Sequence, residues 1–313
     1  MIKKNYIIIS ILSILISFQS LSSEIKIVYQ IENEIITTHD IKEEIKYLKI
    51  NKNLSNLNEK ELFQISLNSL LKEKIKKKEI INYYDLSYEN KKNKDLSEKL
   101  LAQVGRQIGF SSLSDFEKNL ISLKIDLISM KKKLLIENYW NQLIYDKYIN
   151  LIKIDEDEIN NQLQKLIDSN TDLLSFDLSE IVILESNEND YKNKLDEILQ
   201  SISNRGFEES AVLFSISESS SSNGRIGWVN ETQVSEIILN EIKNLKIGQF
   251  SKPINTSSGK IILKVNDKKN VSKNLDIEKE KKNLIQYEQN RLLNQFSILY
   301  YKEIESKIYA EKL

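Results

Sequence analysis

The chain contains no cysteine, one histidine, one proline and only seven glycines in 313 residues. Disulfides and thiol chemistry are therefore excluded. The lone His39 cannot build a histidine metal cluster, and it could act in a Ser-His-Asp triad only with suitable partner residues beside it. We expect no metal and no cofactor. Glycine and proline are the main interrupters of regular structure, so their scarcity favours long helices.

The sequence also lacks an excess of charge of either sign, with 45 Lys and Arg residues against 46 Asp and Glu residues. This balance gives no electrostatic reason to expect nucleic acid as a partner, because such binding relies on a surplus of basic residues. Lysines gather in the run 72–78 and at 131–133, but acidic residues accompany them. We interpret both groups as solvated helix faces rather than as sites for anionic partners.

The first 23 residues have the order of a secretory signal peptide. Two lysines precede a continuous apolar and serine run at 6–18, and Ser20-Leu21-Ser22 places small residues before a cleavage point after Ser22 or Ser23. The apolar run is shorter than the roughly 20 residues that a membrane-spanning helix needs. We predict export to the periplasm with no stable membrane insertion after cleavage, and an uncleaved N-terminal anchor is the alternative.

The few glycines and the single proline divide the rest of the chain. Five of the seven glycines lie between Gly206 and Gly259, together with Pro253. This stretch favours tight turns and strands, whereas apolar residues on both sides of it recur at helical spacing. We predict an α+β protein with a helical domain at 24–170, an inserted α/β domain at 172–268, and a C-terminal helix at 271–313 that packs on the first domain.

Local patterns predict the elements within these parts. A strand at 26–30 comes first, Thr37-x-x-Asp40 is typical of a capping box that starts a helix, and four or five helices fit 38–168. The inserted domain is predicted to contain strands at 175–184, 224–228, 249–254 and 260–266, and helices at 191–202, 207–214 and 234–245. The serine run at 219–222 is interpreted as a flexible loop.

A fixed order of residues in the inserted domain resembles the parvulin family of peptidyl-prolyl isomerases. The residues that carry the resemblance are Phe207, Ser215, Gly224-x-x-Gly227-Trp228, Gly248-x-x-Ser251-x-Pro253-Ile254, and Gly259 followed by Ile261-Ile262-Leu263. The flanks, with 31–37 leading into a helix, helices at 60–82 and 89–145, and a final helix, are similar to SurA-type periplasmic chaperones. The resemblance covers nearly the whole chain after residue 23, with one parvulin-like segment where the fullest form of that family has two.

The resemblance implies a site that twists an X-Pro bond without a nucleophile. The barrier to that rotation is about 20 kcal/mol, so the site needs an apolar seat for the proline ring and a polar network around the carbonyl. The candidate catalytic residues by resemblance are Glu180, Ser217, Thr256 and Ser258. The candidate substrate-binding residues are Ile226, Val234, Ile238 and Ile261.

The two histidines of the family would fall at Glu180 and Ile261, and neither is present. Ile261 supplies no donor or acceptor, and Glu180 would be an ionisable group in a partly buried position that must pair or shift its pKa. We therefore expect weak or absent isomerase activity, with 172–268 acting as a binding module. The alternative is a working isomerase in which Glu180, Ser217 and Thr256 form a substitute network.

The joint pattern predicts a periplasmic chaperone for unfolded polypeptide clients, above all outer-membrane β-barrel precursors. No nucleotide-binding motif is present, so release would occur without ATP. One alternative is an active periplasmic isomerase, and another is an assembly subunit that binds one folded partner. The aromatic residues Tyr139, Trp140, Tyr145 and Tyr148 either line a groove for unfolded chains or pack in the core, and both interpretations remain open here.

Overall fold

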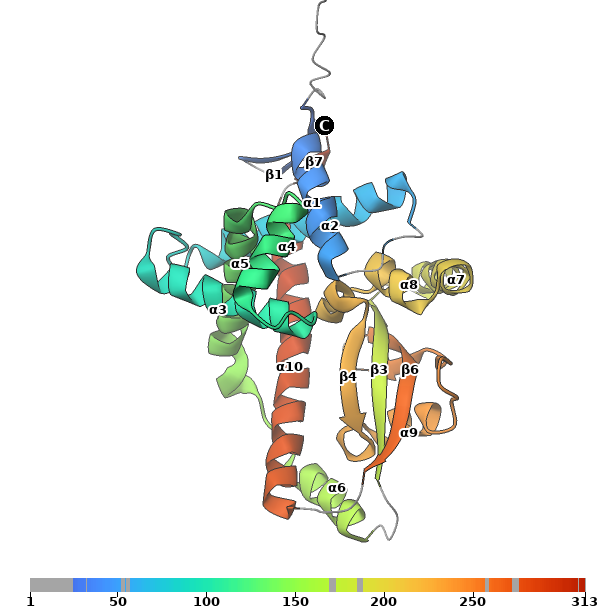
Figure 1. Cartoon of the computed structure of the whole chain (residues 1–313). Helices are drawn as coiled ribbons and strands as arrows, with labels where there is room; N and C mark the ends of the chain where they lie inside the picture. Colours follow the sequence, from blue (N-terminus) through green and yellow to red (C-terminus); the bar gives the residue numbers. More distant parts are fainter. Residues whose placement is uncertain are drawn as a thin grey trace, which may run out of the picture.

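The structure, a computed structural model, describes residues 25–31, 33–51, 54, 57–168, 173–184, 188–256, 259–271, 276–308 and 310–312. The predicted signal peptide lies outside these residues. Within the described ranges, no helix is both long and apolar enough to cross a membrane. The predicted α+β class is confirmed: a helical part, a mixed inserted segment and a long final helix follow one another along the chain (Figure 1).

The N-terminal part of the chain is built mainly from helices. These are α1 (Thr38–Asn51), α2 (Glu59–Ile80), α3 (Lys91–Gln107), α4 (Leu113–Ser122) and α5 (Leu127–Tyr148), followed by the 3-10 helix η1 (Ile149–Leu151) and by α6 (Glu156–Asp168). Helix α10 (Ile277–Lys307) returns after the inserted segment. The predicted capping box at the start of α1 is confirmed, because the Thr37 N–H donates to Asp40 Oδ2 at 2.7 Å and the Asp40 N–H donates to Thr37 Oγ1 at 3.2 Å.

The core of the helical part forms where α2, α5 and α10 meet. Trp140 is fully buried there, and its indole N–H donates to the Ser297 hydroxyl of α10 at 2.8 Å. Tyr139 is also buried in this cluster, and Tyr148 packs against it. Of the two interpretations of the aromatic residues, core packing therefore holds for these three, whereas Tyr145 remains 45 % exposed.

A small sheet joins the two ends of the described chain. Its strands β1 (Ile27–Ile31), β2 (Glu34–Thr37) and β7 (Ala310–Lys312) lie in the order β2-β1-β7, and both pairings are antiparallel. Figure 1 shows the C-terminal end beside β1. The third strand was not predicted, because three residues are too few to establish an alternating pattern.

The inserted segment folds around a four-stranded antiparallel sheet in the order β4-β3-β6-β5. The strands are β3 (Leu173–Ile183), β4 (Arg225–Asn230), β5 (Ile254–Thr256) and β6 (Gly259–Val271), and the helices are α7 (Glu188–Arg205), α8 (Phe207–Phe214) and α9 (Glu236–Ile242), with the 3-10 helix η3 (Glu231–Gln233) before α9. Alternation along β3 sends Ile181 toward α7 and α8, and Leu178 toward the apolar cluster that includes α9. The two faces of the sheet thus have separate cores.

One local prediction in the inserted segment holds only in part, and another is wrong. The predicted strand at 249–254 is interrupted: the Ser251 N–H donates to the Leu263 carbonyl at 2.7 Å and the Val265 N–H donates to the Gln249 carbonyl at 3.0 Å, but regular pairing resumes only at Ile254, since Pro253 before it has no N–H to donate. The serine run is not a flexible loop: it belongs to the 3-10 helix η2 (Glu218–Ser222). Its start is capped by the Ser217 hydroxyl, which accepts from the Ser219 N–H at 3.4 Å.

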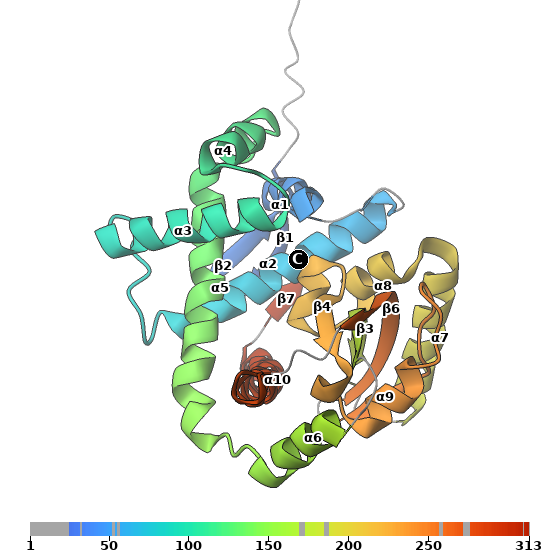
Figure 2. The same ribbon diagram turned by 60° about the horizontal axis from the view of Figure 1, so that its bottom comes forward.

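Helix α10 lies between the two halves of the molecule. In both ribbon views it runs between α5 on one side and the sheet of the inserted segment on the other (Figures 1 and 2). Helix α6 packs against the N-terminal end of α10, beside the sheet. A second contact joins α1 and α2 to α8, where Leu48 of α1 and Ile65 of α2 pack against Val212 and Leu213. The inserted segment is therefore held against the helical part from two directions.

Candidate functional site

Glu180 lies in the middle of β3, opposite Leu263 of β6. Its side chain is only 8 % exposed. One carboxylate oxygen, Oε1, accepts hydrogen bonds from the Ser217 hydroxyl at 2.6 Å and from the Ser219 hydroxyl at 2.8 Å. The structure therefore brings Glu180 and Ser217 together, as the family resemblance implied, and adds Ser219 to the pair.

Burial dominates the titration of Glu180. Removal from water raises the pKa of Glu180, and the hydrogen bonds from Ser217 and Ser219 lower it by less, so the net pKa lies above its ordinary value of 4.5. Both partners are neutral hydroxyls, which stabilise the anion less than a basic side chain would. The group therefore binds a proton more readily than an exposed glutamate does.

The turn after η2 fits closely against β3. Gly224 has a φ of +76°, and its carbonyl accepts the Glu180 N–H at 2.7 Å. A Cβ at this position would lie 2.5 Å from the Glu180 carbonyl oxygen and 2.7 Å from the Ala211 Cβ. Only glycine combines the left-handed backbone with so close an approach. The presence of Gly224, one of the residues that carry the resemblance, therefore has a direct physical explanation.

Of the other two polar candidates, Thr256 does not join this pair. Thr256 donates through Oγ1 to the Gly259 carbonyl at 2.8 Å, at the tip of the β5-β6 hairpin. Gly259 lies four residues along β6 from Leu263, the partner of Glu180, which corresponds to about 13 Å of strand. Ser258 lies outside the described residues. A role for either residue remains a prediction.

Three of the four predicted substrate-binding residues belong to one apolar cluster. Val234 is buried there, and Ile238 and Ile261 are partly buried against the same cluster. Ile226 is 39 % exposed and lies outside the cluster, because it is the extra residue of a β-bulge that re-aims β4. Tyr287 of α10 packs onto the cluster, so the helical part contributes to this face.

Tyr287 also lies within electrostatic reach of Glu180. Burial raises the pKa of the Tyr287 phenol, and the negative charge of Glu180 raises it further. Ile261 pairs with Val182 on the strand beside Glu180 and offers no polar atom. Among the described residues, the site thus holds one buried carboxyl group surrounded by hydroxyls and apolar side chains. Neither family histidine is present to share its proton.

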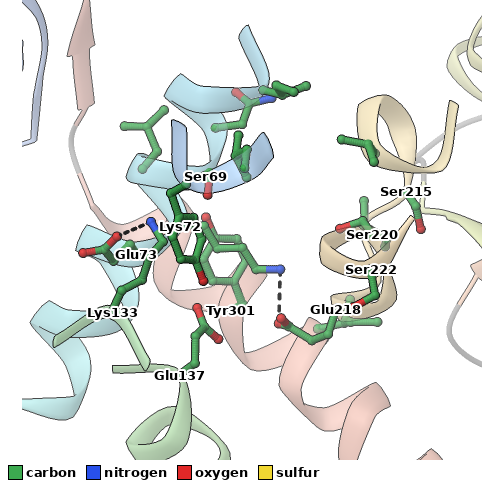
Figure 3. A pocket seen from close by; sticks show the side chains of 18 of the residues that line it. Ser69, Lys72, Glu73, Lys133, Glu137, Ser215, Glu218, Ser220, Ser222 and Tyr301 are labelled. Atoms are coloured by element: carbon green, nitrogen blue, oxygen red, sulfur yellow. Dashed lines mark hydrogen bonds and ion pairs between the residues drawn. The ribbon is translucent and has the colours of Figure 1, made fainter. Parts of the chain in front are cut away.

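A separate pocket of about 650 Å³ lies where the helical part meets the inserted segment. We call it the junction pocket. Its walls come from α1, α2, α3, α5 and α10 on one side and from α8 and η2 on the other, and Figure 3 shows Lys72 and Glu218 meeting across it. Among the lining residues are the apolar Leu71, Val104, Leu134, Leu213 and Ile298 and the polar Asn68, Ser69, Gln107, Asn141 and Ser220.

Charged groups from both halves of the molecule meet at this pocket. Lys76 is fully buried, and its ammonium contacts Glu137 Oε2 of α5 at 2.6 Å and Glu218 Oε1 of η2 at 3.1 Å. Lys72, four residues earlier on α2, contacts the same Glu218 oxygen at 3.1 Å. The interpretation of 72–78 as a solvated face is therefore wrong for Lys76, because two carboxylates from other elements compensate its burial.

The pKa values of the two partners at this contact are shifted in opposite directions. Burial alone would lower the pKa of Lys76, but the negative charges of Glu137 and Glu218 outweigh it and raise that pKa. Burial alone would raise the pKa of Glu218, but the charges of Lys76 and Lys72 outweigh it and lower that pKa to about 2. The contact is thus an ion pair with both members charged near neutral pH.

Two more lysines predicted to be solvated, Lys131 and Lys133, are also enclosed, and Lys131 is buried beside Glu117 at 3.3 Å. Lys133 of α5 contacts Glu44 Oε2 and Glu73 Oε2, each at 2.6 Å, and its ammonium lies 4.7 Å from the centroid of the Tyr47 ring. The charges of these carboxylates offset the burial and raise the pKa of Lys133. Lys132, between the other two lysines of the triple, is exposed, so the prediction holds for that residue.

The residues of the candidate sites that the sequence did not indicate are Ser219, Glu218, Lys76 and Tyr287. Ser219 begins the serine run, where composition favoured a loop, and Glu218 directly precedes it. The only signal for Lys76 was its spacing of four residues from Lys72, which places both side chains on one helix face. Spacing alone does not tell which face a helix buries.

Comparison with known proteins addresses the inserted segment directly. Residues 176–267 match a family model described as "Rotamase: PPIC-type PPIASE domain". The inserted segment is a rotamase-like domain. The predicted resemblance to parvulin-type isomerases is confirmed for this part of the chain.

Several solved structures are also similar to the chain. A SurA-like chaperone from Campylobacter jejuni is 18 % identical, with 92 % of this chain and 98 % of that chain covered and a TM-score of 0.37. PrsA from Bacillus subtilis is 17 % identical, with 89 % and 92 % covered and a TM-score of 0.29. An isolated PpiC-type isomerase domain is 20 % identical and covers 32 % of this chain and 95 % of its own, with a TM-score of 0.29. No match was found among curated proteins.

Proposed function

We propose that this protein is a periplasmic chaperone that binds unfolded secreted polypeptides, including outer-membrane β-barrel precursors, and that its rotamase-like domain has weak or no isomerase activity. The observation that carries the proposal is the junction pocket, which both halves of the molecule line. Its volume of about 650 Å³ is in the range of sites that hold small ligands or short peptide segments. Aliphatic side chains beside amides and hydroxyls suit a chain that presents side chains and free backbone groups together.

The altered rotamase-like site supports the second half of the proposal. Glu180 and Ile261 stand at the two family histidine positions, and Glu180 already binds two serine hydroxyls of its own chain. Tyr287 of the neighbouring helix packs on the apolar cluster that would seat a proline ring. Binding of an unfolded segment costs ordering entropy, so a modest affinity with release independent of ATP is expected.

A light-scattering experiment tests the chaperone function. An unfolded β-barrel protein is diluted from urea with and without an equimolar amount of this protein, and reduced scattering is expected. Asn68→Trp places a large side chain at the pocket wall and should weaken the effect. Asn161→Trp, at an exposed position of α6 outside the pocket lining, is the matched control. Unchanged scattering with the wild-type protein would exclude the function.

Cell fractionation tests the location. The predicted signal peptide at 1–23 supports export, and the mature protein should be recovered in the periplasmic fraction with an N-terminus at residue 23 or 24. A chain that keeps its first residues and stays in the membrane fraction would support the uncleaved anchor instead.

The family-model match favours a second candidate function, an active peptidyl-prolyl cis-trans isomerase. In that case the buried Glu180 with Ser217 would serve the reaction in place of the histidines. A protease-free assay on a short X-Pro peptide separates the two candidates. Acceleration that is lost in Ile238→Ala and Ser217→Ala would establish the isomerase, whereas a rate equal to buffer in the wild-type protein supports the binding module.

A further inference from the structure

Three consecutive residues at the start of η2 point in opposite directions. The hydroxyls of Ser217 and Ser219 donate to Glu180 inside the rotamase-like domain. Glu218, between them, turns the other way and binds Lys76 of α2. One short segment therefore connects the altered isomerase position with the helical part of the molecule.

The same segment is a wall of the junction pocket. Glu218, Ser220 and Ser222 line it, and Figure 3 shows all three on the ribbon that faces α2. A short 3-10 helix has weak hydrogen-bond geometry of its own, so its position depends on what holds its side chains. On the side of the rotamase-like domain, Glu180 is the group that holds two of them.

We propose that Glu180 is a positioning residue of the junction pocket: it fixes η2 through Ser217 and Ser219 so that Glu218 reaches Lys76 and closes the pocket wall. The position that the family uses for a catalytic histidine thereby braces a binding pocket in the neighbouring part of the molecule. The binding arm of the test below rests on the proposed chaperone function, and the exchange arm does not.

The chemistry of the carboxyl group suits this role. An ionised carboxylate only accepts hydrogen bonds, so both serine hydroxyls must donate to it and are fixed in orientation. Asp177 offers a matched comparison in the same strand, since it is a 5 % exposed carboxylate whose partner is Arg225 at 2.6 Å on β4. Loss of Asp177 removes an ion pair between β3 and β4, in which Arg225 is largely exposed, and leaves the hydrogen bonds between Glu180 and η2 in place.

Amide hydrogen exchange of the whole protein tests the brace. The Ser220 N–H donates to the Ser217 carbonyl and the Gly224 N–H to the Ser219 carbonyl, so these amides report on η2. Glu180→Ala should speed their exchange by roughly tenfold or more, because two hydrogen bonds to a charged group are lost. Glu180→Gln keeps the volume and one acceptor oxygen and should have a smaller effect. Asp177→Ala should change the exchange of the Ser220 amide by less than about twofold, since its partner Arg225 lies on β4, beyond the turn at Gly224.

A binding measurement follows the brace to the pocket. Reduced and alkylated lysozyme serves as the unfolded probe, and Glu218→Gln and Glu180→Ala should each weaken its affinity by roughly fivefold. Combined, they should weaken it no more than either alone, because Glu180 acts through Glu218. Additive losses, or an η2 that exchanges as slowly in Glu180→Ala as in the wild-type protein, would overturn the proposal. If the wild-type protein fails to bind the probe, the chaperone function fails, and the exchange result still decides whether Glu180 holds η2.

Discussion

Two carboxylates with different partners, Glu180 and Glu218, behave differently. Glu180, in the rotamase-like domain, is buried beside neutral hydroxyl partners, and burial raises its pKa. Glu218, at the junction, is partly buried, but two ammonium groups face it and lower its pKa. The charge of the partner, rather than burial, therefore decides the direction of the shift. The same difference separates the two regions. The rotamase-like domain holds a carboxyl group with neutral partners, whereas the junction holds an ion pair between the two halves of the molecule.

The largest expected effect comes from the rotamase-like side. In Gly224→Ala the new Cβ would meet the Glu180 carbonyl and the Ala211 side chain, so we expect a loss of about 3 kcal/mol in the free energy of unfolding. Gly227→Ala is the control, because its φ of +86° is equally left-handed but no heavy atom lies within 4 Å. It should cost only about 1–2 kcal/mol from the backbone strain. Equal losses in urea unfolding would show that close packing at Gly224 is unimportant.

The next effect belongs to the junction. Lys76→Met leaves Glu137 and Glu218 without their shared cation and should cost about 2–3 kcal/mol, less than for fully buried pairs because both carboxylates are partly exposed. Lys77→Met, which loses a pair with Glu34 from a lysine that is 43 % exposed, should cost under about 1 kcal/mol. Urea unfolding measures both. A stable Lys76→Met protein would mean that the junction does not depend on this pair.

The pH dependence of stability should separate the two carboxylates by sign. The raised pKa of Glu180 means that its contribution falls as the pH rises from about 4.5, because the unfolded chain ionises first. The lowered pKa of Glu218 means that its contribution is present above about 4.5 and is lost as the pH falls toward 2.

Substitution by glutamine removes each dependence. Glu180→Gln should flatten the decline of the free energy of unfolding above about pH 4.5, and Glu218→Gln should flatten its loss below about pH 4.5. Each slope should change by at most about 1.4 kcal/mol per pH unit. Urea unfolding at a series of pH values records both. Parallel curves for the two variants would contradict the assignment of opposite shifts.

The smallest expected effect concerns Thr256. Thr256→Val removes the hydrogen bond to the Gly259 carbonyl at the hairpin tip and should cost about 0.5–1 kcal/mol. It should leave the exchange of the η2 amides unchanged, since Thr256 lies far from Glu180 along the sheet. Faster exchange of η2 in this variant would return Thr256 to the network that the resemblance implied.

The sequence predicted what depends on local periodicity and on glycine. Helix α8 was predicted with the bounds that the structure has, and the capping box at Thr37 formed as expected, because neighbouring residues determine both. The pairing of Glu180 with Ser217 followed from the family spacing. Glu218 and Lys76 could not be paired from the sequence, since 142 positions separate them and their contact depends on how two halves pack. Composition gave a wrong prediction for the serine run, because the hydrogen bonds from Ser217 and Ser219 to the buried Glu180 order a segment that would otherwise be solvated.

The pairing of β7 with β1 has a consequence for the order in which the molecule forms. The rotamase-like domain is a continuous stretch of chain and can fold as soon as it is complete. The helical part needs α10 and β7, which are made after the inserted segment, before Trp140 contacts Ser297 and the sheet at β1 gains its third strand. Until α10 is made, the helices α2 and α5 lack the partner that covers their apolar faces. The helical part is for that interval itself incompletely folded, and the pairing of α10 and β7 ends that state.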